Sequence, residues 1–134
     1  MSAEAESDVI VDFVFEDGLL YVVVANVGDR PALQVSFKFG TAFRGLGGSV
    51  EMTRLPLLRA IPFLAPRKEI RTLLDSAADY FARGEPTKIT VTVSYRAPDG
   101  TSRKAAITHD LAIYRDLAYV VPSRAGLGSD TRPA

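Results

Sequence analysis

Hydrophobic and polar residues alternate with a period of two along much of this chain. The stretch 89–96 (ITVTVSYR) is one example, and 33–39 (LQVSFKF) is another. Successive side chains of a β-strand point to opposite faces, so each run predicts a strand with one apolar and one polar side. Several such strands in succession predict sheets that bury their apolar sides against each other.

Turn-forming residues divide this pattern into seven predicted strands. They span residues 9–15, 19–26, 32–39, 55–63, 69–74, 87–96 and 103–114. Asp17-Gly18 and Pro98-Asp99-Gly100 predict hairpins, because glycine adopts the positive φ that such turns need. The 19–26 strand is apolar on both faces, which predicts a central position in its sheet. Pro56 and Pro62 restrict the 55–63 strand to a sheet edge.

Residues 75–84 break the strand pattern and predict one short helix near residues 76–83. Asp75 or Ser76 can cap its start, and Gly84 can end it. We expect Tyr80 and Phe81 to plug the end of the sandwich. The prediction is therefore all-β: an immunoglobulin-like Greek-key sandwich of about seven antiparallel strands. It forms a single domain over residues 9–121, with a flexible N-terminal arm (1–8) and a disordered C-terminal tail (122–134).

Three stretches resemble a group of bacterial immunoglobulin-like domains. They are LLYVVVANVGDRPALQVSF, IPFLAPRKEI and ITVTVSYRAPDG. Their turns are similar to the N-x-G-x-x-P-A, L-A-P-G and V-x-Y-x-D-x-x-G patterns of CARDB-like and fibronectin-type sandwich modules. Arg67 stands where the second pattern has glycine. The resemblance implies a fold of this type and carries over no catalytic residue.

Composition removes several classes of function. The chain has no cysteine, which excludes disulfides, thiolate metal sites and a cysteine nucleophile. Its 16 basic and 16 acidic residues give zero net charge, so we expect no nucleic-acid partner. No apolar run approaches the ~18 residues of a membrane span. The acidic start lacks the features of a secretory signal. The expectation is a cytoplasmic protein without membrane insertion, or a soluble fragment of an anchored one.

The candidate chemistry is sparse. His109, the single histidine, is a candidate general base or metal ligand beside Asp110. Adjacent strand residues point to opposite faces, however, which favours a partly buried histidine bonded to a backbone carbonyl. A calcium cluster of Glu16, Asp17 and Asp29 is a second hypothesis, without the loop pattern of known calcium motifs. We therefore expect no catalytic residue, no cofactor, no metal site and no enzymatic activity.

Residues 40–54 form a glycine-rich segment that we expect to be a long loop. Such loops are often functional, although this one lacks the G-K-[ST] ending of a phosphate-binding loop. Phe43, Arg44 and Leu46 are the candidate interaction residues in this loop, since exposed apolar side chains can anchor a contact. The alternative is that Phe43 and Leu46 fold back and cap the core.

Together these features predict a non-catalytic protein-interaction or structural module. Its partner is another protein or a second copy, contacted through a sheet edge or the 40–54 loop. Two alternatives stay open at this point. One is a small-ligand binder or enzyme with a pocket under the 40–54 loop near His109. The other is a soluble domain of a larger anchored or virion assembly.

Overall fold

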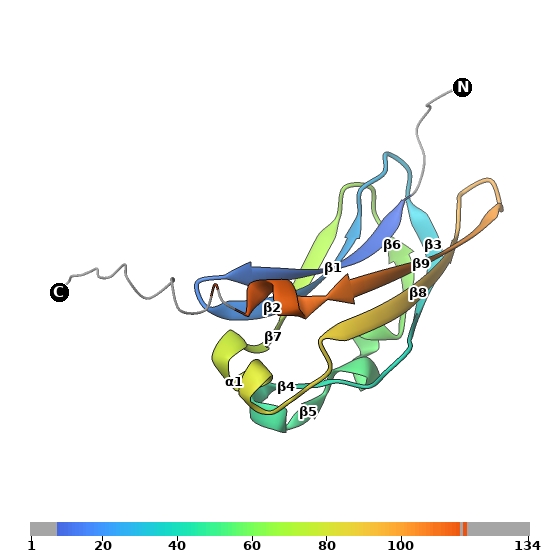
Figure 1. The fold of residues 1–134 in the computed structure, drawn as a ribbon. Helices are drawn as coiled ribbons and strands as arrows, with labels where there is room; N and C mark the ends of the chain where they lie inside the picture. The colour runs from blue at the N-terminus through green and yellow to red at the C-terminus, as the bar shows by residue number, and fades with distance from the viewer. Residues whose placement is uncertain (1–7, 116, 118–134) are drawn as a thin grey trace.

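Two antiparallel sheets pack face to face in a computed structural model that describes residues 8–115 and 117 (Figure 1). One sheet has the order β1-β2-β7, with β1 (Val9–Glu16), β2 (Leu19–Asn26) and β7 (Glu69–Ser76). The other has the order β6-β3-β8-β9, with β6 (Ala60–Leu64), β3 (Ala32–Phe39), β8 (Lys88–Arg96) and β9 (Ser102–Asp110). The prediction of an all-β sandwich is confirmed.

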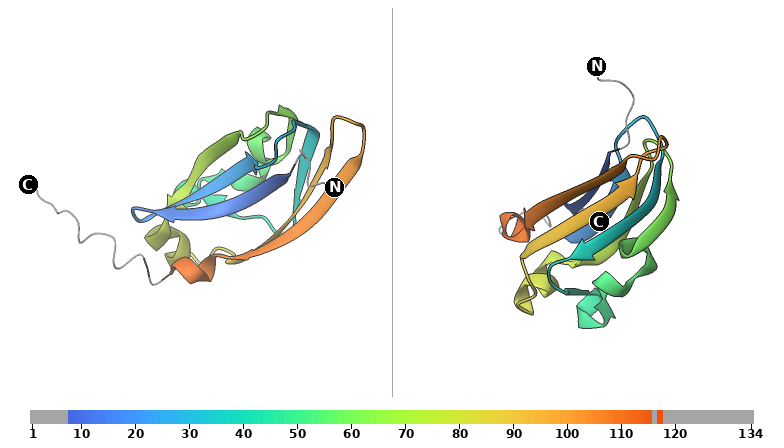
Figure 2. Two further views of the ribbon diagram at one scale, coloured as in Figure 1. Left: turned by 90° about the horizontal axis from the view of Figure 1, so that it is seen from above. Right: turned by 90° about the vertical axis from the view of Figure 1, so that its right-hand side faces the viewer.

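Smaller elements gather at one end of the sandwich (Figures 1 and 2). They are the two-stranded ladder of β4 (Arg44–Gly45) and β5 (Val50–Glu51), the 3₁₀ turns η1 (Leu46–Gly48), η2 (Met52–Arg54) and η3 (Pro56–Leu58), and helix α1 (Ala77–Ala82). The hydroxyl of Ser76 accepts a hydrogen bond from the backbone N–H of Asp79 (3.1 Å), which caps α1 as its sequence predicts. A further 3₁₀ turn, η4 (Leu111–Tyr114), follows β9.

The core lies between the two sheets, and side chains at the α1 end close it. Val11, Phe13 and Val22 from one sheet meet Val91 and Val93 from the other. Tyr80 is fully buried and packs edge-on against Phe81, in agreement with the predicted plug at this end. Burying side chains of this size is the main favourable contribution to folding, about 2 kcal/mol for each large one.

The central position predicted for residues 19–26 is confirmed. β2 pairs with β1 on one side and with β7 on the other. Val22 and Val24 face the core, while Val23 and Ala25 on the opposite face are also buried. A strand shielded on both faces and hydrogen-bonded on both edges has almost no contact with water, which is why its sequence is continuously apolar.

Strand β3 departs from the simple alternation of its sequence. Gln34 has a φ of 51°, and the register with β8 shifts between Leu33 and Ser36. This bulge puts Ala32 in phase with Val35, so both are buried, whereas Leu33 pairs with the exposed Phe63. The alternating pattern therefore placed Leu33 on the wrong face.

Several predicted strands end earlier or start later than expected. The 55–63 strand is replaced by η3 and β6, because Pro56 occupies the first turn of η3. The 103–114 strand ends at Asp110, whose carboxylate accepts the N–H of Ala112 and starts η4. The predicted 40–54 loop contains β4, β5 and the two 3₁₀ turns η1 and η2. The predicted arm (apart from Asp8) and tail lie outside the described residues.

The sheets have unequal widths, and β9 extends past the narrower one (Figure 2). Its residues Ser102 to Ala106 are all exposed, including those on the inner face. Side chains that follow this part of the strand reach the neighbouring edge of β1. His109 Nε2 bonds to the carbonyl oxygen of Val11 (2.8 Å). The hydroxyl of Tyr114 donates to the carbonyl oxygen of Phe13 (2.8 Å).

Buried Asn26 joins three segments at the end of the sandwich away from α1. Its Oδ1 accepts the backbone N–H groups of Asp8 (3.1 Å) and Gly28 (3.0 Å). Its Nδ2 donates to the carbonyl oxygens of Arg30 (2.8 Å) and Leu64 (3.2 Å). A buried amide that satisfies four backbone groups is costly to remove, since each partner then loses its hydrogen bond.

Replacing this amide should lower the stability of the whole domain. We expect Asn26→Ala to reduce the free energy of unfolding by about 3 kcal/mol, because buried backbone groups lose their partners. Urea denaturation followed by circular dichroism measures the change. Asp29→Ala is the control, since the Asp29–Arg67 pair is exposed and its loss should cost less than about 1 kcal/mol. Equal losses in the two variants would contradict this role of Asn26.

Candidate interaction face

The outer side of the β6-β3-β8-β9 sheet carries a continuous set of hydroxyl and cationic side chains. We call it the basic sheet face and define it by Ser36, Lys38, Thr90, Thr92, Ser94, Arg96, Lys104 and Thr108. The ladder sets these residues beside one another: Ser94 pairs with Ser36 on one side and Lys104 on the other, and Thr92 pairs with Lys38. The hydroxyls of Thr90 and Thr108 bond across β8 and β9 (2.8 Å).

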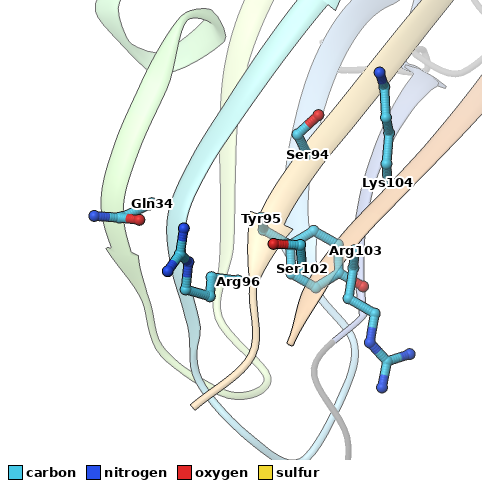
Figure 3. Close-up of a pocket in the computed structure, with 7 residues that line it drawn as sticks. All are labelled: Gln34, Ser94, Tyr95, Arg96, Ser102, Arg103 and Lys104. Atoms are coloured by element: carbon cyan, nitrogen blue, oxygen red, sulfur yellow. The ribbon is translucent and has the colours of Figure 1, made fainter. Parts of the chain in front are cut away.

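Two hollows lie on this face. The first, of about 280 Å³, is lined by Gln34, Ser94, Tyr95, Arg96, Ser102, Arg103 and Lys104 (Figure 3). The second, of about 500 Å³, is lined by Ser36, Phe37, Lys38, Phe39, Gly40, Thr90, Thr92, Ser94 and Lys104. Ser94 and Lys104 belong to both hollows. The hollows therefore form neighbouring parts of one concave surface.

The β3 bulge lies at the first hollow. Gln34 is the residue that holds the left-handed φ of 51°, and its side chain lines the hollow with Arg96 from β8 (Figure 3). A bulge bends its strand and redirects a side chain, so it changes the local shape of a sheet face. A non-glycine residue in this conformation is strained, which makes the position a candidate for function.

The basic sheet face has three cations, Lys38, Arg96 and Lys104, and no carboxylate among its defining residues. The ion pairs that connect described residues lie elsewhere: Arg44–Glu51, Arg67–Asp29, Arg71–Glu16, Arg71–Glu69, Arg83–Asp75 and Arg83–Glu85. Although the whole chain has zero net charge, this surface is positive. Arg96 and Lys104 line the first hollow, and Lys38 and Lys104 line the second. Positive charges grouped in this way favour binding of an anionic group.

A nearby carboxylate belongs to the β8–β9 turn. Hydrogen bonds from Thr101, above all from its backbone N–H (2.8 Å), hold the pKa of Asp99 below its ordinary value, and Arg103 adds to the effect. The Asp99 carboxylate therefore remains charged and bonded to its own turn. This arrangement fixes the hairpin tip that borders the first hollow.

The 40–54 segment is tied down by contacts and does not form an open loop. Phe43 is completely buried and packs edge-on against Phe13 and Phe39. Leu46 is 45% exposed, and Arg44 is exposed and bonds to the carbonyl of Gly48 and to Glu51. Of the three candidate interaction residues, Phe43 therefore follows the core-capping alternative. Arg44 and Leu46 stay at the surface.

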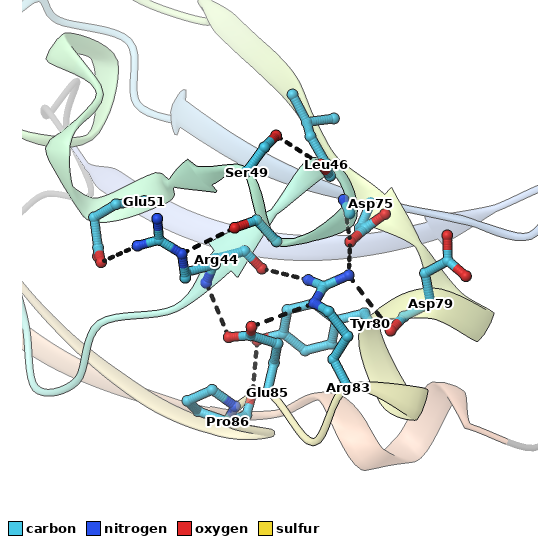
Figure 4. Close-up of polar contacts among 12 residues, drawn as sticks. Arg44, Leu46, Ser49, Glu51, Asp75, Asp79, Tyr80, Arg83, Glu85 and Pro86 are labelled. Atoms are coloured by element: carbon cyan, nitrogen blue, oxygen red, sulfur yellow. Dashed lines mark hydrogen bonds and ion pairs between the residues drawn. The ribbon is translucent and has the colours of Figure 1, made fainter.

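A buried ion pair holds this segment against α1 (Figure 4). Asp75, at the end of β7, is buried and accepts Arg83 Nη1 (2.6 Å) and the backbone N–H of Gly47 (3.1 Å). Arg83 also donates to the carbonyl of Arg44 (2.9 Å). Gly45 sits so close to β7 that a Cβ there would lie 2.1 Å from the carbonyl oxygen of Leu74. The segment is thus fixed by charge, hydrogen bonds and close packing.

His109 lines neither hollow. Its Nε2 contacts the carbonyl of Val11, which accepts only, so this nitrogen carries the proton. Its ring packs edge-on against Phe13, 5.0 Å between centroids. This is the carbonyl-bonded histidine that the strand pattern favours. His109 is separated from Phe43 of the 40–54 segment by the ring of Phe13.

The calcium hypothesis is wrong in its geometry. Glu16 and Asp17 lie before the first residue of β2, whereas Asp29 follows its last residue. An eight-residue strand separates their turns by roughly 25 Å. Glu16 bonds to Arg71 and Asp29 to Arg67. Within the described part of the chain, no three histidine or carboxylate side chains gather as metal ligands would.

The basic sheet face was not among the sites predicted from the sequence. The alternation in 89–96 indicates a polar side for β8, but the sequence alone does not show which strands flank it. Lys38 and Lys104 come from β3 and β9 and join this side only through the strand order. One signal in the sequence could have indicated this face. The polar positions of three predicted strands carry Ser, Thr and Lys, and acidic residues are absent from 34–38, 90–96 and 102–108.

Comparisons with known proteins identify a family without naming an activity. A family model described as a domain of unknown function (DUF8453) matches residues 1–115. No curated protein and no solved structure matches the chain. No helix in the described residues has the length and apolar character needed to cross a membrane.

Tyr80 lies beside Arg83 at the α1 end of the sandwich. Its ionisation should make the free energy of unfolding depend on pH. Burial, and then the Glu85 carboxylate, raises the pKa of its phenol, whose hydroxyl donates to the carbonyl of Pro86 (2.6 Å). The folded state thus favours the neutral phenol. Its stabilising effect is complete below the ordinary pKa of ~10 and is lost as the pH rises above that value.

We expect Tyr80→Phe to cost about 1 kcal/mol at neutral pH, because the hydrogen bond to Pro86 is lost. Between about pH 10 and 11.5 the unmodified chain should lose stability, because the tyrosine of the unfolded state releases its proton. The phenylalanine variant has no such proton, so the difference between the two chains should shrink. Urea denaturation over that pH range measures both free energies. A difference that stays constant with pH would show that ionisation of Tyr80 does not oppose folding.

Proposed function

We propose that this chain, which belongs to the DUF8453 family of domains of unknown function, is a non-catalytic interaction module that binds an acidic polypeptide segment on its basic sheet face. The observation that carries the proposal is the convergence of Lys38, Arg96 and Lys104 around two neighbouring hollows whose linings contain no carboxylate. The proposal replaces the 40–54 loop with a sheet face as the binding surface.

The chemistry of this face suits carboxylates. Lysine and arginine supply positive charge, and the serine and threonine hydroxyls between them supply neutral hydrogen-bond donors. Lys38 and Lys104 stand on strands that flank β8, so they are separated by about 10 Å across the sheet. An extended acidic segment has side chains on one side about every 7 Å and can place carboxylates near both.

Rigidity also favours the sheet face over the 40–54 segment. The defining residues belong to β3, β8 and β9, whose backbones are held by inter-strand pairing. A surface held in place before binding loses less conformational entropy when a partner binds. Phe43, in contrast, would have to leave the core before it could contact a partner, and exposing a side chain of that size costs about 2 kcal/mol or more.

A polypeptide partner is preferred over nucleic acid on grounds of charge. The chain has no net positive charge, and three lysines and arginines are a small footprint for a polyphosphate. The immunoglobulin-like interpretation is compatible with such a role. The strand orders β1-β2-β7 and β6-β3-β8-β9 support it. The contacts of His109 with Val11 and Phe13 support a structural role for this histidine.

Charge reversal on the face tests this function. We expect a labelled twelve-residue peptide of alternating Glu and Ser to bind the chain, and Lys38→Glu/Lys104→Glu to weaken binding at least ten-fold, because attraction becomes repulsion. Fluorescence anisotropy at about 50 mM and 300 mM salt measures both affinities. Binding should weaken at the higher salt, since the contacts are exposed.

The matched control is Arg54→Glu/Lys68→Glu, which changes the net charge equally at exposed positions away from the face. We expect it to reduce peptide binding less than three-fold. An equal loss in both variants would mean that overall charge governs binding. A single-stranded DNA of the same charge that binds as tightly as the peptide would contradict the polypeptide preference.

A further inference from the structure

Within the described part of the chain, no strand pairs with the outer edge of β9. All of its residues from Ser102 to Ala106 are exposed, and Ala105 and Ala106 present little side chain to either face. The pairing of β9 with β8 runs through nine residues without a register shift, so the strand is regular. It contains no proline. An edge of this kind is a template for a further strand.

The backbone groups at this edge can be assigned from the ladder. The N–H of Leu111 donates to Thr87, and the N–H of Ala97 donates to Thr101 (both 2.8 Å). Both bonds continue the β8–β9 register, in which hydrogen-bonded pairs alternate. Odd-numbered residues of β9 therefore bond to β8. The N–H and C=O groups of residues 104, 106, 108 and 110 point to the open edge.

Two of the other three edges, those of β1 and β6, carry features that oppose strand addition. On β1, the carbonyls of Val11 and Phe13 are bonded to His109 and Tyr114, and the N–H of Phe13 donates to the Asp12 carboxylate (2.9 Å). β6 contains Pro62, which cannot donate a hydrogen bond to a further strand. The edge of β9 differs from both, because only the charge of Lys104 and its neighbours discourages strand addition.

We propose that a second copy of this chain adds to the open edge, so that β9 pairs with β9 of the partner in antiparallel orientation about a two-fold axis at Ile107. In this register, Lys104 faces the partner's Asp110, and Ala106 faces the partner's Thr108. These are even-numbered residues, as the assigned backbone groups require. Ile107 faces the partner's Ile107 on the inner side of the sheet.

Charge complementarity selects this register. Lys104 and Asp110 are both exposed and lie on the outer side of the strand, six residues apart. Pairing about Ile107 brings each lysine beside an aspartate, twice in the dimer. A shift by two residues places Lys104 opposite Thr108 or beyond the strand, and both ion pairs are lost. Opposite charges directly across a ladder stabilise pairing, and like charges oppose it.

The two-fold axis is perpendicular to the sheet, so the dimer contains one continuous sheet built from the two four-stranded sheets. Both basic sheet faces then lie on the same side of it. The assembly does not depend on a bound peptide, and its test therefore stands apart from that of the proposed function.

Sedimentation equilibrium of the full chain, without peptide, gives the first test. We expect a monomer–dimer equilibrium that is evident by about 200 µM. Ala106→Pro should raise the dissociation constant at least ten-fold. It removes an N–H that points to the open edge, and leaves the β8 ladder intact. A chain that is monomeric at this concentration, or a proline variant that dimerises as well as the unmodified chain, overturns the proposal.

Charge exchange tests the register. We expect Lys104→Glu alone and Asp110→Lys alone to be monomeric, and their mixture to form a heterodimer, because each then faces an opposite charge. Ile107→Cys should form a disulfide-linked dimer on mild oxidation, since paired Cβ atoms at the axis lie about 5 Å apart. Ala105→Cys is the control, because it faces the partner's His109. Equal cross-linking of the two cysteine variants, or no recovery on mixing, overturns this register.

Discussion

The packing of three strands against four determines where this protein exposes its backbone and its charge. Side chains from β1, β2 and β7 cover the inner faces of β3 and β8, where Val35, Val91 and Val93 are buried. The fourth strand of the wider sheet, β9, lies beyond this cover for half its length. Two sheets of equal width would bury the inner face of β9. The mismatch instead leaves a two-sided, solvent-exposed strand beside a fully packed core.

The opposite end of the molecule is organised by one buried carboxylate. Asp75 receives hydrogen bonds from Arg83, from the N–H of Gly47 and from that of Ser76. A buried carboxylate is tolerated when charge and donors surround it. Here the donors come from the segment after β4 and from the two ends of α1, so satisfying a single group fixes three pieces of chain. This explains how a glycine-rich segment is held in place.

The sequence was informative where a property depends on neighbours along the chain. Continuous apolar character identified β2 as central, and Ser76 and Gly84 framed the short helix. It was less informative where the property depends on partners distant in sequence. Phe43 could be assigned to the core only once Phe13 and Phe39 were placed around it. The bulge at Gln34 interrupts the alternation of apolar and polar residues, which is unbroken in the sequence of 33–39. The basic sheet face required the order of β3, β8 and β9, which no local pattern contains.

Gln34 also shows how stability and surface shape are linked in this fold. Glycine would adopt the same backbone geometry with little strain, so it is the residue that optimisation of thermal stability would select. It would also remove the amide side chain that lines the first hollow beside Arg96. Engineering that improves the heat resistance of this domain at position 34 would thus simplify its surface, and the more robust protein would be the less discriminating one.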